Sequence, residues 1–214
     1  IIFENERYLN LKKRYSNSLE YITGHESTQQ STKKAKDSEL IVMGSGNLGL
    51  IYLTQWKQRL TYEELVMLFP ELIPGLVKHP GIGFILVNSL TNGGMVIGEN
   101  GIYYLENDKV VGENPIAKFG KNAARHLKRQ NSFDNMPDIM VNSFYDEKTE
   151  EVCAFEELIG NHGGLGGDQT KPFILYPSEW EDPGELIGAS SIHHFLKREI
   201  NNLTGMEISC SIPN

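Results

Sequence analysis

The amino-acid sequence predicts an α/β protein in which a mixed β-sheet is flanked by helices. Apolar runs typical of buried strands alternate along the chain with segments of helical period. Two turn signals, Asn92-Gly93 and Asn100-Gly101, interrupt this alternation and predict a small antiparallel meander. A length of 214 residues is enough for one buried core, so we expect residues 1–214 to form a single domain.

The N-terminal part is predicted to contain a helix, a loop and two strands. Apolar residues recur at steps of three and four over residues 7–22, which is the period of one helix face. Residues 24–38 are polar and carry no apolar period, so we expect a mobile or irregular loop that cannot offset its ordering entropy. Strands are predicted at 39–43 and 48–53, on either side of the turn Gly44-Ser45-Gly46-Asn47.

The sequence predicts the start of a helix at Thr61. Thr61 is followed three residues later by Glu64, which is the capping-box spacing, so a helix is expected to start at Thr61. The last predicted helix, at 189–203, has its apolar residues on one face. These residues are Ile192, Leu196, Ile200 and Leu203. In chain order, the elements predicted after the helix that starts at Thr61 are a short helix at 72–77, strands at 84–87, 95–97 and 102–105, a helix at 117–130, strands at 138–142 and 172–176, and a helix at 189–203.

The composition excludes several classes of protein. Asp and Glu number 28 against 20 Lys and Arg, a net charge of −8. That balance argues against binding a nucleic-acid duplex. No apolar run approaches the roughly 20 residues that span a bilayer, so we expect a soluble domain with no membrane insertion by this segment. Cys153 and Cys210 form no metal-binding motif. We interpret them as unpaired, largely structural thiols, although one disulfide is arithmetically possible.

The segment with chemical content is Asn161-His162-Gly163-Gly164-Leu165-Gly166-Gly167. Imidazole is the commonest metal-binding side chain, so His162 is a candidate ligand. Gly163, Gly164, Gly166 and Gly167 let the backbone adopt positive φ and approach a metal or a phosphate closely. A glycine-rich bend with an incidental histidine explains the same residues equally well.

Other glycine and catalytic motifs are weaker or missing. Gly44 to Gly49 has the GxGxxG spacing after a strand, but residues 50–53 predict another strand instead of the helix that nucleotide binding requires. The chain has no GxSxG, HExxH, CxxC or DxDxDG motif. A complete hydrolytic site cannot be assembled from its residues, and we therefore assign no catalytic residue.

The glycine segment is part of a longer resemblance. Residues 161–177 resemble the C-terminal signature of the bacterial type I phosphodiesterase/nucleotide pyrophosphatase-like branch of the alkaline phosphatase superfamily. The resemblance extends from about Tyr15 to about Leu203, and the glycine motif is its most specific part. Four further stretches are similar to the same branch, at residues 13–20, 43–52, 60–64 and 79–84.

The resemblance implies a partial alkaline phosphatase-like fold and a metal-dependent phosphoric ester hydrolase. Members use two divalent metal ions, usually zinc, and a Thr or Ser nucleophile. His162 corresponds to the last metal-binding histidine, and the four glycines to a substrate-shaping loop. The nucleophile and the other ligands lie upstream in that family.

The chain would therefore be the C-terminal portion of the catalytic domain of a bacterial, membrane-anchored parent. Its partners would be the N-terminal half of that domain and a phosphate-ester substrate. No metal ion is expected to bind this portion tightly by itself, because zinc needs three or four ligands. The alternative is a non-catalytic binding or interaction module that keeps the fold.

Overall fold

A computed structural model describes residues 39–156 and 161–205. The predicted helix at 7–22, the predicted loop at 24–38 and Cys210 lie outside the described residues.

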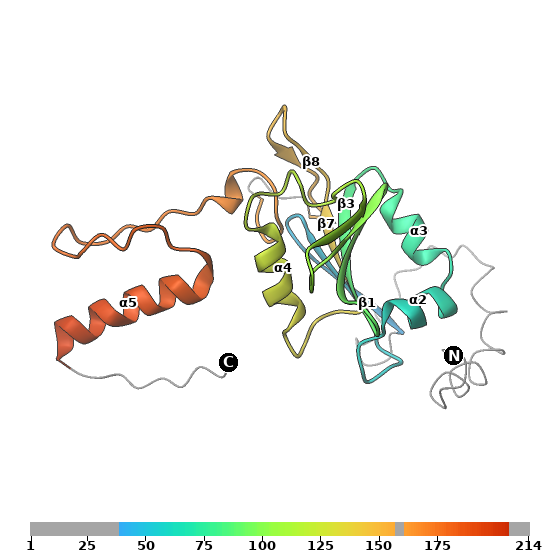
Figure 1. Cartoon of the computed structure of the whole chain (residues 1–214), viewed down its shortest axis with the longest axis horizontal. Helices are drawn as coiled ribbons and strands as arrows, with labels where there is room; N and C mark the ends of the chain where they lie inside the picture. The colour runs from blue at the N-terminus through green and yellow to red at the C-terminus, as the bar shows by residue number, and fades with distance from the viewer. Residues whose placement is uncertain (1–38, 157–160, 206–214) are drawn as a thin grey trace.

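One β-sheet forms the centre of the described structure (Figure 1). Within the described ranges it has seven strands in the order β1-β2-β7-β3-β4-β5-β6. The strands are β1 (Leu40–Ser45), β2 (Leu48–Leu53), β3 (Ile82–Ser89), β4 (Gly93–Gly98), β5 (Gly101–Tyr104), β6 (Lys109–Gly112) and β7 (Ile139–Ser143).

The sheet is antiparallel, so the expectation of a mixed sheet is wrong. Tight turns join β1 to β2 and link β3 through β6, and strands joined in this way run antiparallel. The predicted meander is confirmed in β3, β4 and β5, and β6 extends it. Strand β7 enters between β2 and β3 and runs antiparallel to both.

Helices cover both faces of the sheet. Figure 1 shows α2 (Tyr62–Leu68) and α3 (Leu72–Val77) on one side and α4 (Ala123–Asn131) on the other. Alternate residues of β3 point to the two faces, as a strand period of two requires. Phe84 and Leu86 belong to the core under α4, whereas Ile85 and Val87 belong to the core under α2 and α3.

The helix boundaries follow from local chemistry. Thr61 caps α2 in a complete capping box, in which the Glu64 side chain accepts from the Thr61 backbone N–H at 2.9 Å. The helix predicted at 117–130 begins later, at Ala123. Gly120 has a φ of +98°, which no α-helix can include, so residues 115–118 form turns before it.

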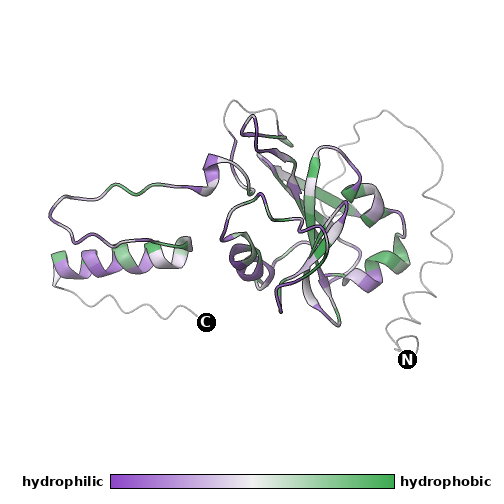
Figure 2. Ribbon diagram, turned by 45° about the horizontal axis from the view of Figure 1, so that its top comes forward, coloured by the Kyte–Doolittle hydropathy of each residue, from purple (hydrophilic) through white to green (hydrophobic). Residues whose placement is uncertain are grey.

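After β7 the described chain forms several short elements and then an arm that lies away from the sheet. A small hairpin of β8 (Tyr145–Asp146) and β9 (Glu151–Val152) precedes the glycine segment, and a 3-10 turn, η3 (Asp168–Thr170), follows it. Helix α5 (Gly188–Thr204) then matches the helix predicted at 189–203. We call residues 171–205 the arm, and Figures 1 and 2 show α5 lying away from the sheet.

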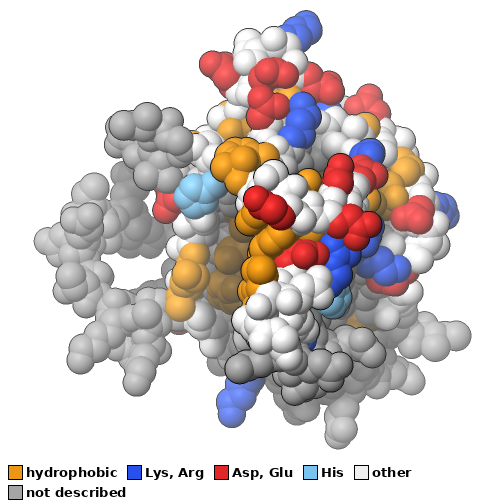
Figure 3. All heavy atoms as spheres, turned by 90° about the vertical axis from the view of Figure 1, so that its left-hand side faces the viewer, with side chains coloured by type: hydrophobic (Ala, Val, Ile, Leu, Met, Phe, Trp, Pro, Cys, Tyr) orange, Lys and Arg blue, Asp and Glu red, His pale blue; other side chains and the backbone are white. Residues whose placement is uncertain are grey.

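The strand predicted at 172–176 does not form. No described strand lies beside it to share a hydrogen-bond ladder, and its side chains Phe173 and Leu175 are each 86% exposed. The predicted apolar face of α5 is also largely uncovered, with Leu196 37%, Ile200 43% and Leu203 71% exposed. Figure 3 shows hydrophobic side chains at the surface on this side of the molecule.

Cys153 is free and exposed, so the interpretation of a thiol packed into the structure is wrong for this residue. No helix in the described ranges combines the length and the apolar character needed to cross a bilayer.

Candidate functional site

The glycine segment is docked on the turn between β1 and β2. The backbone N–H of Asn47 donates to the carbonyl of His162 at 3.2 Å. Gly46 has a φ of +59°, and a side chain there would collide with the His162 carbonyl. Gly163 has a φ of +102°, and a side chain there would collide with the Ser45 carbonyl. Two glycines on opposite sides of the contact therefore let the two backbones touch.

Two buried asparagines, Asn47 and Asn142, hold the next two residues of the segment. Both are 0% exposed, and we call them the asparagine clamp. The Asn47 side chain accepts from the Gly164 N–H at 2.9 Å and donates to the Leu165 carbonyl at 3.0 Å. The Asn142 side chain accepts from the Leu165 N–H at 2.7 Å and donates to the same carbonyl at 3.1 Å. Carboxamides are suited to this role because each offers a donor and an acceptor.

Gly164 is needed because of the clamp. A Cβ atom at this position would lie 2.7 Å from Asn142 Oδ1 and 2.7 Å from Asn47 Nδ2. A side chain would therefore separate the asparagines from the backbone they bind. The close approach predicted for the glycines is made to the protein's own asparagines and turn.

The segment ends in η3, where further side chains bind its backbone. Gln169 donates to Asn47 Oδ1 at 3.1 Å and to the Gly166 carbonyl at 2.9 Å. Thr170 donates to the Gly167 carbonyl at 2.8 Å. Gly166 has a φ of +113° and Gly167 a φ of +68°, conformations that glycine adopts at low cost.

His162 differs from its neighbours because only its backbone is held. Its side chain is exposed, and no hydrogen bond or ion pair with another described residue restrains the imidazole. Two polar side chains lie near His162 in the sequence, those of Asn161 and Glu156. Both amide atoms of Asn161 are shielded from solvent and have no partner within residues 39–156 and 161–205. Glu156 Oε2 accepts from the Gly46 N–H at 2.8 Å.

The described residues do not complete a metal site. Nowhere in residues 39–156 and 161–205 do three His, Cys, Asp or Glu side chains gather at metal-binding distance. A zinc site needs three or four ligands. An exposed imidazole on a restrained backbone fits the role of one ligand, and the remaining ligands would have to come from elsewhere.

The structure brings together two glycine clusters that lie far apart in the sequence. The Gly44 to Gly49 cluster forms the β1–β2 hairpin, as the strand predicted at 48–53 implies, and its turn receives the His162 segment. Sequence reasoning missed the asparagine clamp. A signal was present for Asn142, which is the one amide side chain in the buried run Ile139–Ser143.

Comparison with known proteins identifies no relative. No protein-family model matches the chain, and no similar protein was found among curated proteins or solved structures. A functional proposal therefore depends on the resemblance of the local motifs and on the geometry of the His162 segment.

Proposed function

We propose that this chain is the C-terminal part of a metal-dependent phosphodiesterase/phosphatase-like hydrolase. In this proposal His162 supplies one metal-binding imidazole, and Gly163, Gly164, Gly166 and Gly167 shape the surface that meets the phosphate ester. The observation that carries the proposal is the contrast at His162, whose backbone is docked while its imidazole is exposed. Metal ligands need a restrained backbone and an accessible side chain.

The chain's own contribution in this proposal is to position the imidazole. The β1–β2 turn binds the His162 carbonyl, and the asparagine clamp binds Gly164 and Leu165, so the His162 backbone is held through hydrogen bonds that do not involve its side chain. A divalent ion, most often zinc in the resembling family, would supply Lewis-acid stabilisation of the phosphoryl oxygens when bound.

The proposed partner is the N-terminal half of the same catalytic domain. It would provide the nucleophile and the other metal ligands. The arm supports a partner of this kind, because Phe173, Leu175 and Leu203 are exposed apolar side chains that a larger assembly could cover.

The test is His162→Ala in the full-length protein. We expect a loss of bound metal, measured by elemental analysis, and a loss of phosphodiester turnover. The free energy of unfolding should change by no more than about 0.5 kcal/mol, since the exposed side chain has few contacts to lose. The matched control is His194→Ala, an exposed histidine on α5.

The two variants also test a structural role for His162. A destabilised His162→Ala protein that keeps all its metal would reject the ligand role. Equal metal loss in both variants would reject it as well.

A non-catalytic binding module is the second candidate. Such a module needs no metal ligands, and residues 39–156 and 161–205 gather no group of three of them. Elemental analysis of the full-length protein distinguishes the candidates, because a binding module that keeps only the fold would hold no stoichiometric metal ion.

A further inference from the structure

A cleft of about 380 Å³ lies at the opposite end of β2 from the His162 segment. The segment docks beside Leu48, whereas the cleft is lined by Tyr52 and Leu53, roughly 16 Å further along the strand at about 3.3 Å per residue. Its other walls come from the β2–α2 connection and from the α4–β7 connection. The cleft is therefore separate from the proposed metal site.

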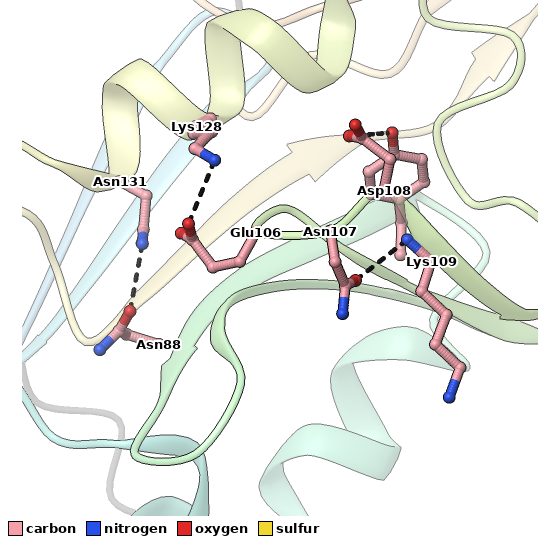
Figure 4. A network of polar contacts seen from close by, with 8 residues as sticks. Asn88, Glu106, Asn107, Asp108, Lys109, Lys128 and Asn131 are labelled. Atoms are coloured by element: carbon pink, nitrogen blue, oxygen red, sulfur yellow. Dashed lines mark hydrogen bonds and ion pairs between the residues drawn. The ribbon is translucent and has the colours of Figure 1, made fainter.

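Arg59 lines this cleft with one edge of its guanidinium unused. Its Nη1 donates to Asn131 Oδ1 at 2.8 Å. Asn131 in turn donates to Asn88 Oδ1 at 3.1 Å, as Figure 4 shows. The Nε and Nη2 atoms are shielded from solvent and have no acceptor among the residues that the structure describes. Unpaired buried donors on a cation lower the stability of the folded state, so an acceptor bound at this edge would remove an unfavourable term.

Asp138 lies close enough to interact with the Arg59 charge but does not fill that edge. Its two carboxylate oxygens accept from the backbone N–H groups of Leu53, at 2.7 Å, and of Leu60. These bonds close the connection between β2 and α2. Burial lowers the pKa of Arg59, and the charge of Asp138 opposes this effect.

The other walls of the cleft combine charge with aromatic surface. Lys57 adds a second cation, Asp134 adds an exposed carboxylate, and Tyr52 and Trp56 add two rings. The Tyr52 hydroxyl donates to the Asn135 carbonyl at 3.2 Å and joins the two walls.

We infer that this cleft binds the oxyanion of a small aromatic molecule, with Arg59 Nε and Nη2 as its bidentate donors. A carboxylate and a phosphate each present two oxygens at the spacing of a guanidinium edge. Tyr52 and Trp56 offer stacking surface to the aromatic part of the ligand. Because Nε and Nη2 are shielded from solvent, the ligand has to displace the groups that cover them as it enters. This inference does not depend on the proposed hydrolase activity.

Trp56 supplies the signal for the test. The chain has two tryptophans, and the other one, Trp180, packs on Phe195 in the arm with ring centroids 5.8 Å apart. In a Trp180→Phe background, tryptophan fluorescence reports on Trp56 alone. Benzoate, phenyl phosphate and neutral benzyl alcohol are titrated at constant ionic strength.

We expect the fluorescence of Trp56 to change saturably with benzoate and with phenyl phosphate, and we expect benzyl alcohol to bind more weakly than either anion. The tighter of the two anions identifies the oxyanion that the cleft prefers. Arg59→Gln should weaken anion binding by about tenfold or more, because it removes a charge-assisted bidentate contact. The control variant Lys121→Gln removes a cation from an exposed ion pair with Glu185 in the arm, and it should leave the affinity for both anions unchanged.

Three results would overturn the inference. They are a flat titration with both anions, equal affinity in Arg59→Gln and the parent protein, and equal binding of benzyl alcohol. If circular dichroism shows that Arg59→Gln does not fold, the anion affinity of Arg59→Lys is measured in its place. Lysine keeps the charge without the planar fork, so undiminished affinity in Arg59→Lys also rejects the bidentate contact.

Discussion

Asn47 and Asn142 are fully buried, yet each carboxamide meets backbone groups of the glycine segment at hydrogen-bonding distance. A buried amide without partners is destabilising, so these residues and the segment depend on each other. Their position under Gly164 and Leu165 gives the segment one docked arrangement.

Removing one asparagine should therefore cost stability. We expect Asn142→Ala to lower the free energy of unfolding by about 1–3 kcal/mol, because the N–H of Leu165 loses its acceptor. Chemical denaturation measures the change. Asn135→Ala, at an exposed position, is the control and should stay near the parent value. Equal losses in the two variants would show that the clamp contributes nothing specific.

Glycines in different surroundings should respond in opposite directions to alanine. Gly164→Ala places a Cβ atom 2.7 Å from both clamp side chains, so we expect a loss of about 1–3 kcal/mol. Gly75 lies in α3, and outside its own helix no described heavy atom lies within 4 Å of the same position, so Gly75→Ala should stabilise the protein by about 0.5–1 kcal/mol. Thermal unfolding of both variants measures the signs, and a stabilised Gly164→Ala protein would contradict the described docking.

The α2 cap gives a prediction at the scale of an element. Thr61 accepts from the Glu64 N–H at 3.4 Å and also donates to the Glu64 carboxylate at 2.9 Å. Thr61→Ala should cost about 1 kcal/mol, the usual loss for a threonine N-cap. Thr91→Ala, in the β3–β4 turn, is a threonine control outside any helix. Denaturant midpoints at a constant slope compare the two, and an unchanged midpoint in Thr61→Ala would argue against the cap.

Whether an element could be predicted depended on how local its cause is. The capping box of α2 and the turns of the meander involve residues a few positions apart, and both were predicted. The strand at 172–176 needed a neighbouring strand, which no short segment specifies. The start of α4 depended on the positive φ of Gly120, which leaves no period in the sequence.

The candidate site shows the same limit. His162 and the glycines were found because their residue types are distinctive. The clamp was missed because Asn47 and Asn142 lie about 95 residues apart and meet only when β7 pairs with β2.

At the scale of the whole molecule, the described residues divide into a well-packed sheet and an exposed arm. The sheet has a core on each face. The arm packs mainly on itself, through Tyr176 and Trp180 against Phe195, with ring centroids 5.4 and 5.8 Å apart. Its remaining apolar side chains are the surface that the proposed N-terminal half would cover.

The last prediction concerns catalysis by this 214-residue chain alone. Hydrolysis of aryl phosphates and phosphodiesters should stay at background with zinc or manganese added. The described residues place one histidine, held only through its backbone, in the glycine segment, and they form no three-ligand cluster. A single imidazole holds zinc weakly. Metal content after gel filtration and product release are measured on the chain and on His162→Ala, which should behave alike. Metal-dependent turnover that disappears in His162→Ala would mean that this chain already contains a complete site, and the proposed dependence on an N-terminal half would then be wrong.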